Sequence, residues 1–432
     1  MSLSSARLAR QKDAAQILNG VAKTLPLLRS VAWSDDWRGA FLSRGALPKP
    51  TYDSIDVTSA REGIADARAK LGGVNPDSGD VVGAWLLRLT EKLDVMTALL
   101  QSRGTAEFFT HSKTLFGEPT QLMIDRKTRV IDLARHVDGT LDGLDFDKLV
   151  IEGFQREFGA AEFADSLAPL LAEHLGDAAP RIEIVKGLSA KALAGSKRIR
   201  VREGAVFTPR DIDQLLQHEA LVHTATTLNG RAQKGFPVLG RAHAGTTEIQ
   251  EGLAVFAEMI SGAMDPRRFR RLSDRVLAAQ MSIDGADFKE VFDFYLPRSL
   301  GAEAAYNSTR RIFRGGVIAG GAPFTKDIVY LNGLLRVHNF MRTVVKLGRA
   351  DLIRILFTGK MDLEDLPAIA ALAGAGELTP PKYMPAWAKD LRFLVSYLAY
   401  SGFLNQVKMP GFQSYYEDAL KDVPVVWDFT SS

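Results

Sequence analysis

Apolar side chains recur at three- and four-residue intervals through most of the first 175 residues, with charged residues between them. This spacing places the apolar side chains on one face of an α-helix. The segment 81–103, VVGAWLLRLTEKLDVMTALLQSR, is a clear example. Pro48, Pro50 and Gly143 interrupt the pattern, as expected between successive helices. Residues 1–110 are therefore predicted to form an N-terminal helical region.

The period of the pattern changes between residues 181 and 203. RIEIVKG and KRIRVRE alternate apolar and polar residues on either side of AKALAGS, which is typical of two short β-strands. A small antiparallel sheet is expected there. From residue 266 onward the pattern is again mostly helical. The chain is therefore predicted to have an α+β fold dominated by helices, with residues 111–432 as the larger domain.

Two capped helices follow the predicted strands. Residues 208–211, Thr-Pro-Arg-Asp, combine an N-cap, a first-turn proline and an acidic third position. A helix of about 20 residues is expected to begin there and to carry HEALVH. A second helix, containing EIQEGLAVFAEMI, is expected to follow Thr246 and Thr247 and to end near Gly262.

Composition limits the chemistry that the chain can perform. It contains no cysteine, which excludes disulfides, thiolate metal ligands and a cysteine nucleophile. The net charge is only +3, so nucleic acid is not an expected partner. No apolar run reaches the length of about 18 residues that a membrane span needs, and no secretory signal is present. The sequence therefore predicts a cytoplasmic protein with no membrane partner, in which histidine and carboxylate would bind any metal.

His218, Glu219 and His223 form the pattern HExxxH, one residue longer than the HExxH of zinc peptidases. On a regular α-helix a five-residue step turns about 500°, so the two imidazoles would diverge by about 140°. A π-type bulge would bring His223 back beneath His218. The motif therefore predicts a local helix distortion; the alternative is two unrelated histidines on an amphipathic helix.

Glu251 is the best candidate for a third ligand. Gly252 and Ala254 follow it, and such small residues permit close approach to the helix that carries the histidines. Glu248 and Glu258 lie on nearby turns, where either could orient a ligand imidazole. Two histidines and one carboxylate would bind one Zn²⁺ with an open fourth position, leaving Glu219 as the general base for zinc-activated water. The alternative for Glu251 is an exposed, solvated glutamate.

Three segments carry a resemblance to a known family: HEALVHTATTLNG, GRAHAGTTEIQEGLAVFAE and YNSTRRIFRGG...PFTKDIVYLNG. They resemble bacterial proteins named for their QEGLA motif, which are similar to the microtubule-associated tyrosine carboxypeptidases. The resemblance implies a zincin-like metallopeptidase core in residues 111–432, with His218, His223 and Glu251 as zinc ligands and Glu219 as the catalytic residue. In zincins an extended substrate pairs with an edge strand beside the metal helix, the place that KRIRVRE would take here. The alternative is an ordinary edge strand protected from aggregation by its charge.

A carboxypeptidase needs a cation for the free carboxylate at the C-terminus of its peptide or protein substrate, and arginine suits that task. The sequence offers a group of candidates for substrate binding: Arg310, Arg311, Arg314, Lys326 and His243. Tyr306 or Tyr330 could donate a hydrogen bond to the oxyanion. A solvated helix face is the alternative for the arginines, and it is also the preferred interpretation of the basic stretch PRRFRRLSDR at 266–275.

The sequence thus predicts a zinc-dependent peptidase, with a carboxypeptidase as the first hypothesis. Within enzymes, the alternatives are an aminopeptidase and another metal-dependent amide hydrolase. A different class of protein is also open: a non-catalytic regulatory or interaction protein with a structural or idle zinc site. Glu219 argues against that class, because a structural zinc site needs no base beside its first ligand.

Overall fold

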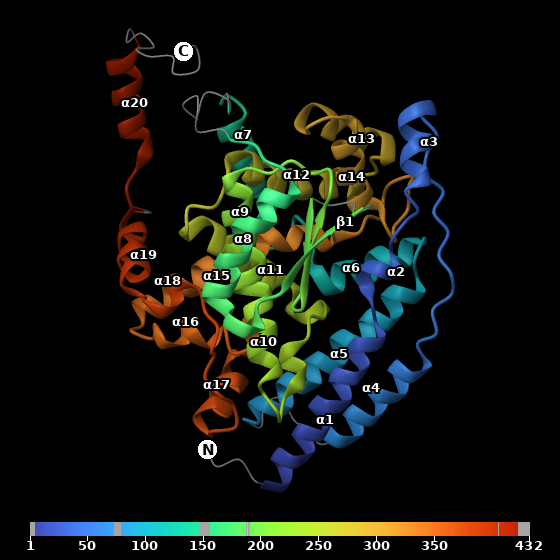
Figure 1. Ribbon diagram of the computed structural model, residues 1–432, viewed down its shortest axis with the longest axis vertical. Helices are drawn as coiled ribbons and strands as arrows, with labels where there is room; N and C mark the ends of the chain where they lie inside the picture. Colours follow the sequence, from blue (N-terminus) through green and yellow to red (C-terminus); the bar gives the residue numbers. More distant parts are fainter. Residues whose placement is uncertain are drawn as a thin grey trace.

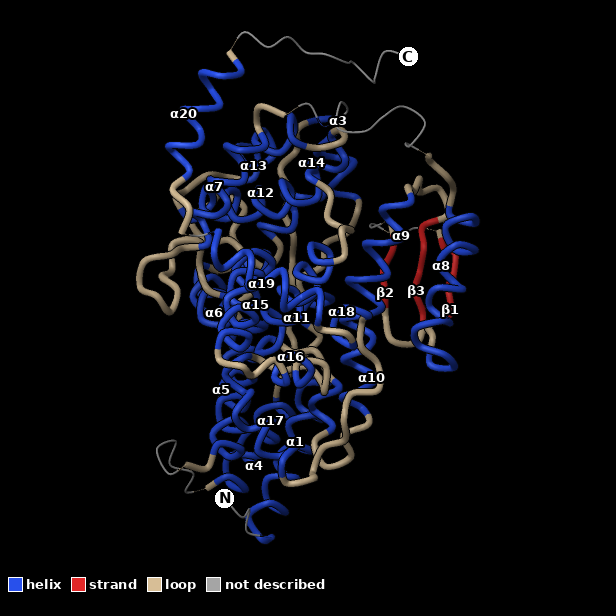
Figure 2. Tube along the Cα trace, turned by 90° about the vertical axis from the view of Figure 1, so that its left-hand side faces the viewer, coloured by secondary structure: helices blue, strands red, loops and turns tan. Residues whose placement is uncertain are grey.

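The computed structural model describes residues 5–72, 79–144, 146, 156–186, 188, 191–404 and 406–421. The described chain is mostly helical, with one small sheet at its side (Figures 1 and 2). The helices before the sheet are α1 (Ser5–Thr24), α2 (Leu27–Ser30), α3 (Asp36–Arg44), α4 (Thr58–Leu71), α5 (Val81–Gln101), α6 (Ala106–Phe116), α7 (Val130–Leu141) and α8 (Ala160–Leu175).

The helices after the sheet are α9 (Pro209–Leu215), the π-helix η4 (Leu216–Thr224), α10 (Ala225–Arg231), α11 (Ala244–Ile260), α12 (Pro266–Ile283), α13 (Phe288–Tyr295), α14 (Ala302–Phe313), α15 (Val329–Lys346), α16 (Asp351–Ile355), α17 (Leu366–Gly374), α18 (Ala386–Lys389), α19 (Arg392–Leu404) and α20 (Met409–Leu420). Short 3₁₀ turns lie between some of them: η3 (Gly176–Ala178), η5 (Pro237–Gly240), η6 (Leu296–Arg298), η7 (Thr325–Ile328) and η8 (Leu363–Asp365).

The sheet contains a strand that the alternation did not predict. Its strands are β1 (Arg181–Val185), β2 (Ala192–Ala194) and β3 (Arg198–Arg202), in the order β1-β3-β2. β1 runs parallel to β3 and β2 runs antiparallel to it. The expected antiparallel sheet is therefore wrong in part, because the sheet is mixed. The expected edge strand, KRIRVRE, is the central strand, since the three residues of β2 take the edge beside it.

Two hydrophobic cores hold the described chain together. The larger core runs from α1 to α19 and includes residues on both sides of position 110. The smaller core lies between the sheet and helices α8, α9 and η4, where Phe163 stacks on Phe207. Figure 2 shows this smaller unit, with α8 across the sheet, at the side of the large helical body. The division at residue 110 stays a prediction.

Helices α11 and α15 cross in backbone contact near the centre of the molecule (Figure 1). A Cβ added to Gly252 would lie 2.1 Å from the carbonyl carbon of Gly333, and one added to Gly333 would lie 2.1 Å from the carbonyl oxygen of Glu248. The sequence correctly indicated that a helix comes close at Gly252. The expected neighbour, the helix that carries the histidines, was wrong, because Gly252 faces Gly333 on α15.

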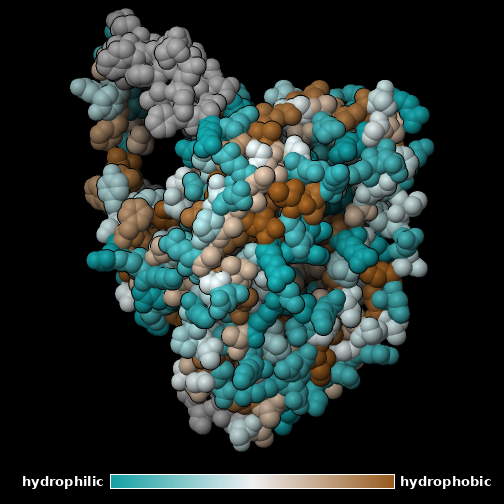
Figure 3. Space-filling model, in the orientation of Figure 1, coloured by the Kyte–Doolittle hydropathy of each residue, from teal (hydrophilic) through white to brown (hydrophobic). Residues whose placement is uncertain are grey.

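The C-terminal helices present an apolar surface. Phe393, Tyr400 and Phe403 on α19 and Tyr415 on α20 are each more than 60% exposed. α20 extends from the body at the upper left of Figure 1, and hydrophobic residues are visible along this arm in Figure 3. Among the described residues, no helix combines the length and apolar character that a membrane crossing requires.

The glycine contact makes a prediction about stability. Gly252→Ala should destabilise the protein by about 3 kcal/mol or more, because two backbones must separate to admit one methyl group. Gly139→Ala on α7 is the matched control, since nothing lies within 4 Å of an added Cβ there. That change should be neutral or stabilising by up to about 1 kcal/mol, because alanine has the higher helix propensity. Urea unfolding of both variants measures the difference, and equal midpoints would contradict the prediction.

Candidate metal site and its surroundings

The helix that carries the histidines is built in three sections. Thr208 and Asp211 cap its start reciprocally: the Asp211 carboxylate accepts from the Thr208 amide at 2.8 Å, and the Asp211 amide donates to the Thr208 hydroxyl at 3.3 Å. After α9 the chain adopts π-helical geometry over Leu216–Thr224 and returns to α-helix in α10. The predicted helix distortion is confirmed. The helix expected to begin after Thr246 and Thr247 starts earlier: α11 begins at Ala244, with His243 as its N-cap residue.

The π-helix places the two imidazoles side by side. The ring centroids of His218 and His223 are 4.9 Å apart, with the ring planes at 84°. Glu251 Oε2, from α11, lies 3.5 Å from Nε2 of each histidine. One ligand atom from each of the three side chains lies within 4.8 Å of the other two. Three potential metal ligands therefore converge from two helices.

The separations in this cluster fit a zinc ion. Tetrahedral zinc with ligand distances of about 2.0–2.1 Å holds its ligand atoms roughly 3.3 Å apart, close to the 3.5 Å between Glu251 and each imidazole. Burial disfavours the imidazolium, but hydrogen bonds to Glu251 and Glu258 raise the pKa of His218 to about 10. The carboxylates thus favour positive charge at this point, which a metal can supply in place of the proton.

Glu258 orients the first histidine. Its Oε1 lies 2.6 Å from Nδ1 of His218, and the carboxylate also accepts from the Arg268 guanidinium at 3.1 and 3.2 Å. Burial opposes ionisation, but Arg268 and His218 lower the pKa of Glu258 to about 2. An ionised carboxylate on Nδ1 keeps a proton there, so Nε2, the nitrogen that faces Glu251, is the one available to a metal ion.

Glu251 is also held in its ionised form. Its other oxygen, Oε1, lies 3.5 Å from Nζ of Lys326, whose side chain is 8% exposed. Burial alone would raise the pKa of Glu251, but Lys326 and the two imidazoles lower it well below its usual range. One carboxylate oxygen thus faces the histidines and the other faces a cation.

Glu219 follows the first histidine and is half-buried. Its negative charge acts on both His218 and Lys360. Within the described part of the chain, no hydrogen bond or ion pair engages its carboxylate. The Glu219 carboxylate is therefore not engaged by another described residue.

A cluster of cations lies on the other side of Lys326. Asp327 pairs with Arg311 through a short contact, and Nε of Arg275 lies 3.8 Å from the same carboxylate. Burial would raise the pKa of Asp327, but Arg311, Arg275 and Arg314 hold it well below its usual range. Burial and the charge of Arg311 lower the pKa of Arg314 to about 10. Two guanidinium groups therefore contact one carboxylate, and the charge of a third, Arg314, acts on it.

Tyr330 joins this cation cluster to the metal ligands. The Cζ of Arg275 lies 4.7 Å from the centre of the Tyr330 ring, and Nζ of Lys326 lies 5.5 Å from it. The negative charge of Glu251 also acts to raise the pKa of Arg311 and of Arg268. Among the described residues, Nη1 of Arg275 and Nε of Arg314 are buried without a hydrogen-bond partner. Two guanidinium groups of the cation cluster thus keep an unsatisfied buried donor.

Arg275 is a residue that the sequence analysis missed. The basic stretch 266–275 was interpreted as a solvated face, which is wrong for Arg268 and Arg275, whose side chains are 12% and 16% exposed. The spacing of the arginines could have indicated this. Arg268, Arg271 and Arg275 recur at three- and four-residue steps and therefore share one helix face.

Two of the expected substrate residues lie elsewhere. Tyr306 is fully buried, and its ring packs against Phe41 and Phe288. A hydroxyl enclosed by aromatic rings cannot reach a substrate, so Tyr306 is corrected to a core residue. Arg310, on the same helix, pairs with Asp35 at 2.9 Å. Of the three candidates on α14 and Arg314 at its C-cap, only Arg311 and Arg314 belong to the cation cluster.

His243 and Glu248 occupy the first half of α11. His243 is the N-cap residue, about 12 Å along the helix from Glu251. Burial and the nearby Lys92 lower its pKa to about 3, which favours the neutral ring over a cation at this position. Glu248 accepts from Arg336 at 2.5 Å and from Asn332 on α15. Glu248 therefore ties α11 to α15, and Glu258 is the glutamate that meets a ligand imidazole.

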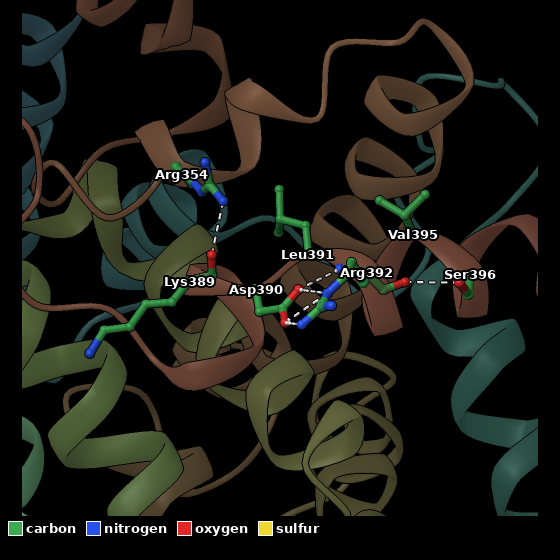
Figure 4. Close-up of a pocket in the computed structure, with 7 residues that line it drawn as sticks. All are labelled: Arg354, Lys389, Asp390, Leu391, Arg392, Val395 and Ser396. Carbon is green, nitrogen blue, oxygen red and sulfur yellow. Dashed lines mark hydrogen bonds and ion pairs between the residues drawn. The ribbon is translucent and has the colours of Figure 1, made fainter.

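A separate hollow of about 710 Å³ lies where α18 meets α19, lined by Arg354, Lys389, Asp390, Leu391, Arg392, Val395 and Ser396. Figure 4 shows that its charged groups are largely paired, with Asp390 bound to Arg392 and Arg354 donating to the Lys389 carbonyl. It contains neither histidine nor a carboxylate cluster, so its chemistry differs from that around His218.

Comparison with known proteins identifies the family of the chain. A family model described as "Microtubule-associated tyrosine carboxypeptidase" matches residues 41–406, the greater part of the 432-residue chain. The matched range contains both histidines, Glu251 and the cation cluster. A comparison with curated proteins finds no match. The chain therefore belongs to the microtubule-associated tyrosine carboxypeptidase family.

Proposed function

We propose that this protein is a zinc-dependent carboxypeptidase that hydrolyses the C-terminal bond of a peptide or protein. The observation that carries the proposal is the convergence of His218, His223 and Glu251, with Glu219 next to the first histidine. Three protein ligands leave a fourth position for water or substrate, as in catalytic zinc sites. Zinc bound there would polarise the substrate carbonyl and make water a stronger nucleophile.

Glu219 is proposed as the general base. It has no hydrogen-bond or ion-pair partner among the described residues to compete for its carboxylate. It would accept a proton from the attacking water and then deliver that proton to the departing amine. Tyr330, which is 9% exposed beside Lys326, is proposed to donate a hydrogen bond to the oxyanion that forms on the scissile carbonyl.

The cation cluster is proposed to bind the free carboxylate of the substrate. Arg275 and Arg311 contact Asp327, and the charge of Arg314 also acts on it, so three positive charges are grouped around one carboxylate. Burial of excess positive charge is unfavourable, and an incoming carboxylate would relieve it with charge-assisted hydrogen bonds. An amidated C-terminus or an internal peptide bond offers no such charge. This supports a carboxypeptidase over an aminopeptidase.

The fold around the site supports a zincin-like core. The mixed sheet and the helix of His218 share the smaller hydrophobic core, so the sheet is held beside the metal ligands. β2 is an edge strand of the sheet, and an extended peptide is proposed to pair along it. The role first expected of KRIRVRE is therefore proposed for β2. A peptide or protein is the expected partner, and the cytoplasmic location stays a prediction.

The first prediction separates metal binding from catalysis. The wild-type protein should bind about one zinc ion, His218→Ala should lose it, and Glu219→Gln should keep it. Both variants should lose hydrolysis of a mixed peptide library, by about 10²-fold to 10⁴-fold for Glu219→Gln, because the base acts only in the reaction. Elemental analysis and release of C-terminal residues provide the two readouts.

Glu303→Gln is the matched control for this experiment, because Glu303 is an exposed glutamate on α14. It should leave both zinc content and hydrolysis unchanged. Absence of zinc from protein prepared with excess metal would refute the proposal and leave a non-catalytic interaction protein. Full activity of Glu219→Gln would refute only the role of that residue.

The second prediction concerns the substrate terminus. Peptides with a free C-terminus should be cleaved, and the same peptides with an amidated C-terminus should resist. Arg275→Lys keeps the charge but removes the planar fork, so kcat/KM for free-acid peptides should fall by roughly 10-fold to 100-fold. Arg349→Lys, at an exposed arginine, should have no effect. Equal cleavage of amidated peptides would contradict the proposed role of the cation cluster.

A further inference from the structure

Lys360 is a buried lysine whose ammonium group lies between the two helices that supply the metal ligands. It follows α16 in a tight segment, where its amide donates to the Leu239 carbonyl at 2.7 Å. Gly359, just before it, permits this path, since an added Cβ would lie 2.8 Å from the same carbonyl oxygen. The residue is only 6% exposed. Backbone packing thus directs its side chain inward.

The ammonium group of Lys360 has three partners, two on the helix of the histidines and one on α11. Nζ donates to the His223 carbonyl at 3.2 Å and lies 3.4 Å from the Thr226 hydroxyl, both on the helix of the histidines. It also donates to Oε1 of Gln250, on α11, at 2.8 Å. Gln250 immediately precedes Glu251 in sequence. Lys360 therefore connects His223, a proposed ligand, to the neighbour of Glu251, beside a direct hydrogen bond that the Thr226 hydroxyl donates to Oε1 of Gln250 at 2.8 Å.

The His223 carbonyl lies at the end of the π-helix, where the hydrogen-bond pattern changes. Three side chains converge on it: the hydroxyl of Thr227 donates at 2.7 Å, that of Thr226 lies at 3.3 Å, and Lys360 donates at 3.2 Å. π-helical turns are rare and need support from their surroundings. These donors stabilise the turn at the residue where its geometry matters, because a regular α-helix would direct His223 away from His218.

We propose that Lys360 is a positioning residue that sets the spacing between His223 and Glu251 through its contacts with the His223 carbonyl and Gln250. The inference rests on the proposed zinc site and concerns its assembly, not the chemical step. Lys360 does not need to touch metal or substrate for this role. The expected consequence of its loss is a folded protein with a loosened ligand set and weaker zinc binding.

The test compares Lys360→Met, Gln250→Met and the double variant with Lys346→Met, a matched change at an exposed lysine of α15. Zinc affinity is measured by competition with a chelator, and melting temperature is measured with and without zinc. Each single variant should bind zinc about 10-fold to 100-fold more weakly, as for other groups that orient ligands. The double variant should be little weaker than Gln250→Met alone, since that change already removes the acceptor that Lys360 and Thr226 share on α11. Lys346→Met should match wild type.

The outcomes separate positioning from general stability. A merely structural lysine would lower the melting temperature equally with and without zinc and would leave the zinc affinity unchanged, which would overturn the inference. If Lys360→Met does not fold, the test rests on Gln250→Met. Wild-type zinc affinity in Gln250→Met would then overturn the inference. If the wild-type protein binds no zinc, the proposed zinc-dependent function is refuted. Zinc binding by wild type with unchanged affinity in the variants would refute only the positioning role of Lys360.

Discussion

Contact between the backbones of α11 and α15 is the constraint on which the rest of the site depends. Gly252 follows Glu251 directly, and Gly333 lies three residues after Tyr330. When these glycines meet, Glu251 is placed near the segment that carries Lys326 and Asp327. Side chains larger than hydrogen would separate the helices and with them the metal ligands and the cations. The polar pair of Glu248 and Arg336 stabilises the same crossing one turn away.

The site is arranged around opposite charges that compensate one another only in part. The carboxylates of Glu251 and Glu258 draw positive charge to the imidazoles, while the guanidinium groups around Asp327 outnumber the carboxylate that they surround. One side of the site therefore attracts a cation and the adjacent side attracts an anion. A zinc ion and a substrate carboxylate would satisfy the two sides together, so their binding is expected to be mutually favourable.

Much of the metal site could be predicted from sequence, because local spacing determines it. HExxxH required a departure from the α-helix, and the π-helix supplies it. Features that depend on distant contacts could not be predicted in this way. Three residues, Ala-Leu-Ala, carry too little pattern to identify β2. Tyr306 and Tyr330 look alike in sequence, and only packing shows that one lies among aromatic rings and the other among cations. Lys360 has no local signal, since its partners are more than 100 residues away along the chain.

The helix of the histidines belongs to both hydrophobic cores. Leu215, Leu216 and Leu221 pack in the smaller core with the sheet, whereas Val222 packs in the larger one. The π-helix turns the apolar face of the chain from one core to the other, and the candidate ligands lie at this boundary. An ion held by His218 on one side and Glu251 on the other would join the two cores, so that they unfold as a single cooperative unit. The thermal transition of the whole protein would then report on whether one small site is occupied.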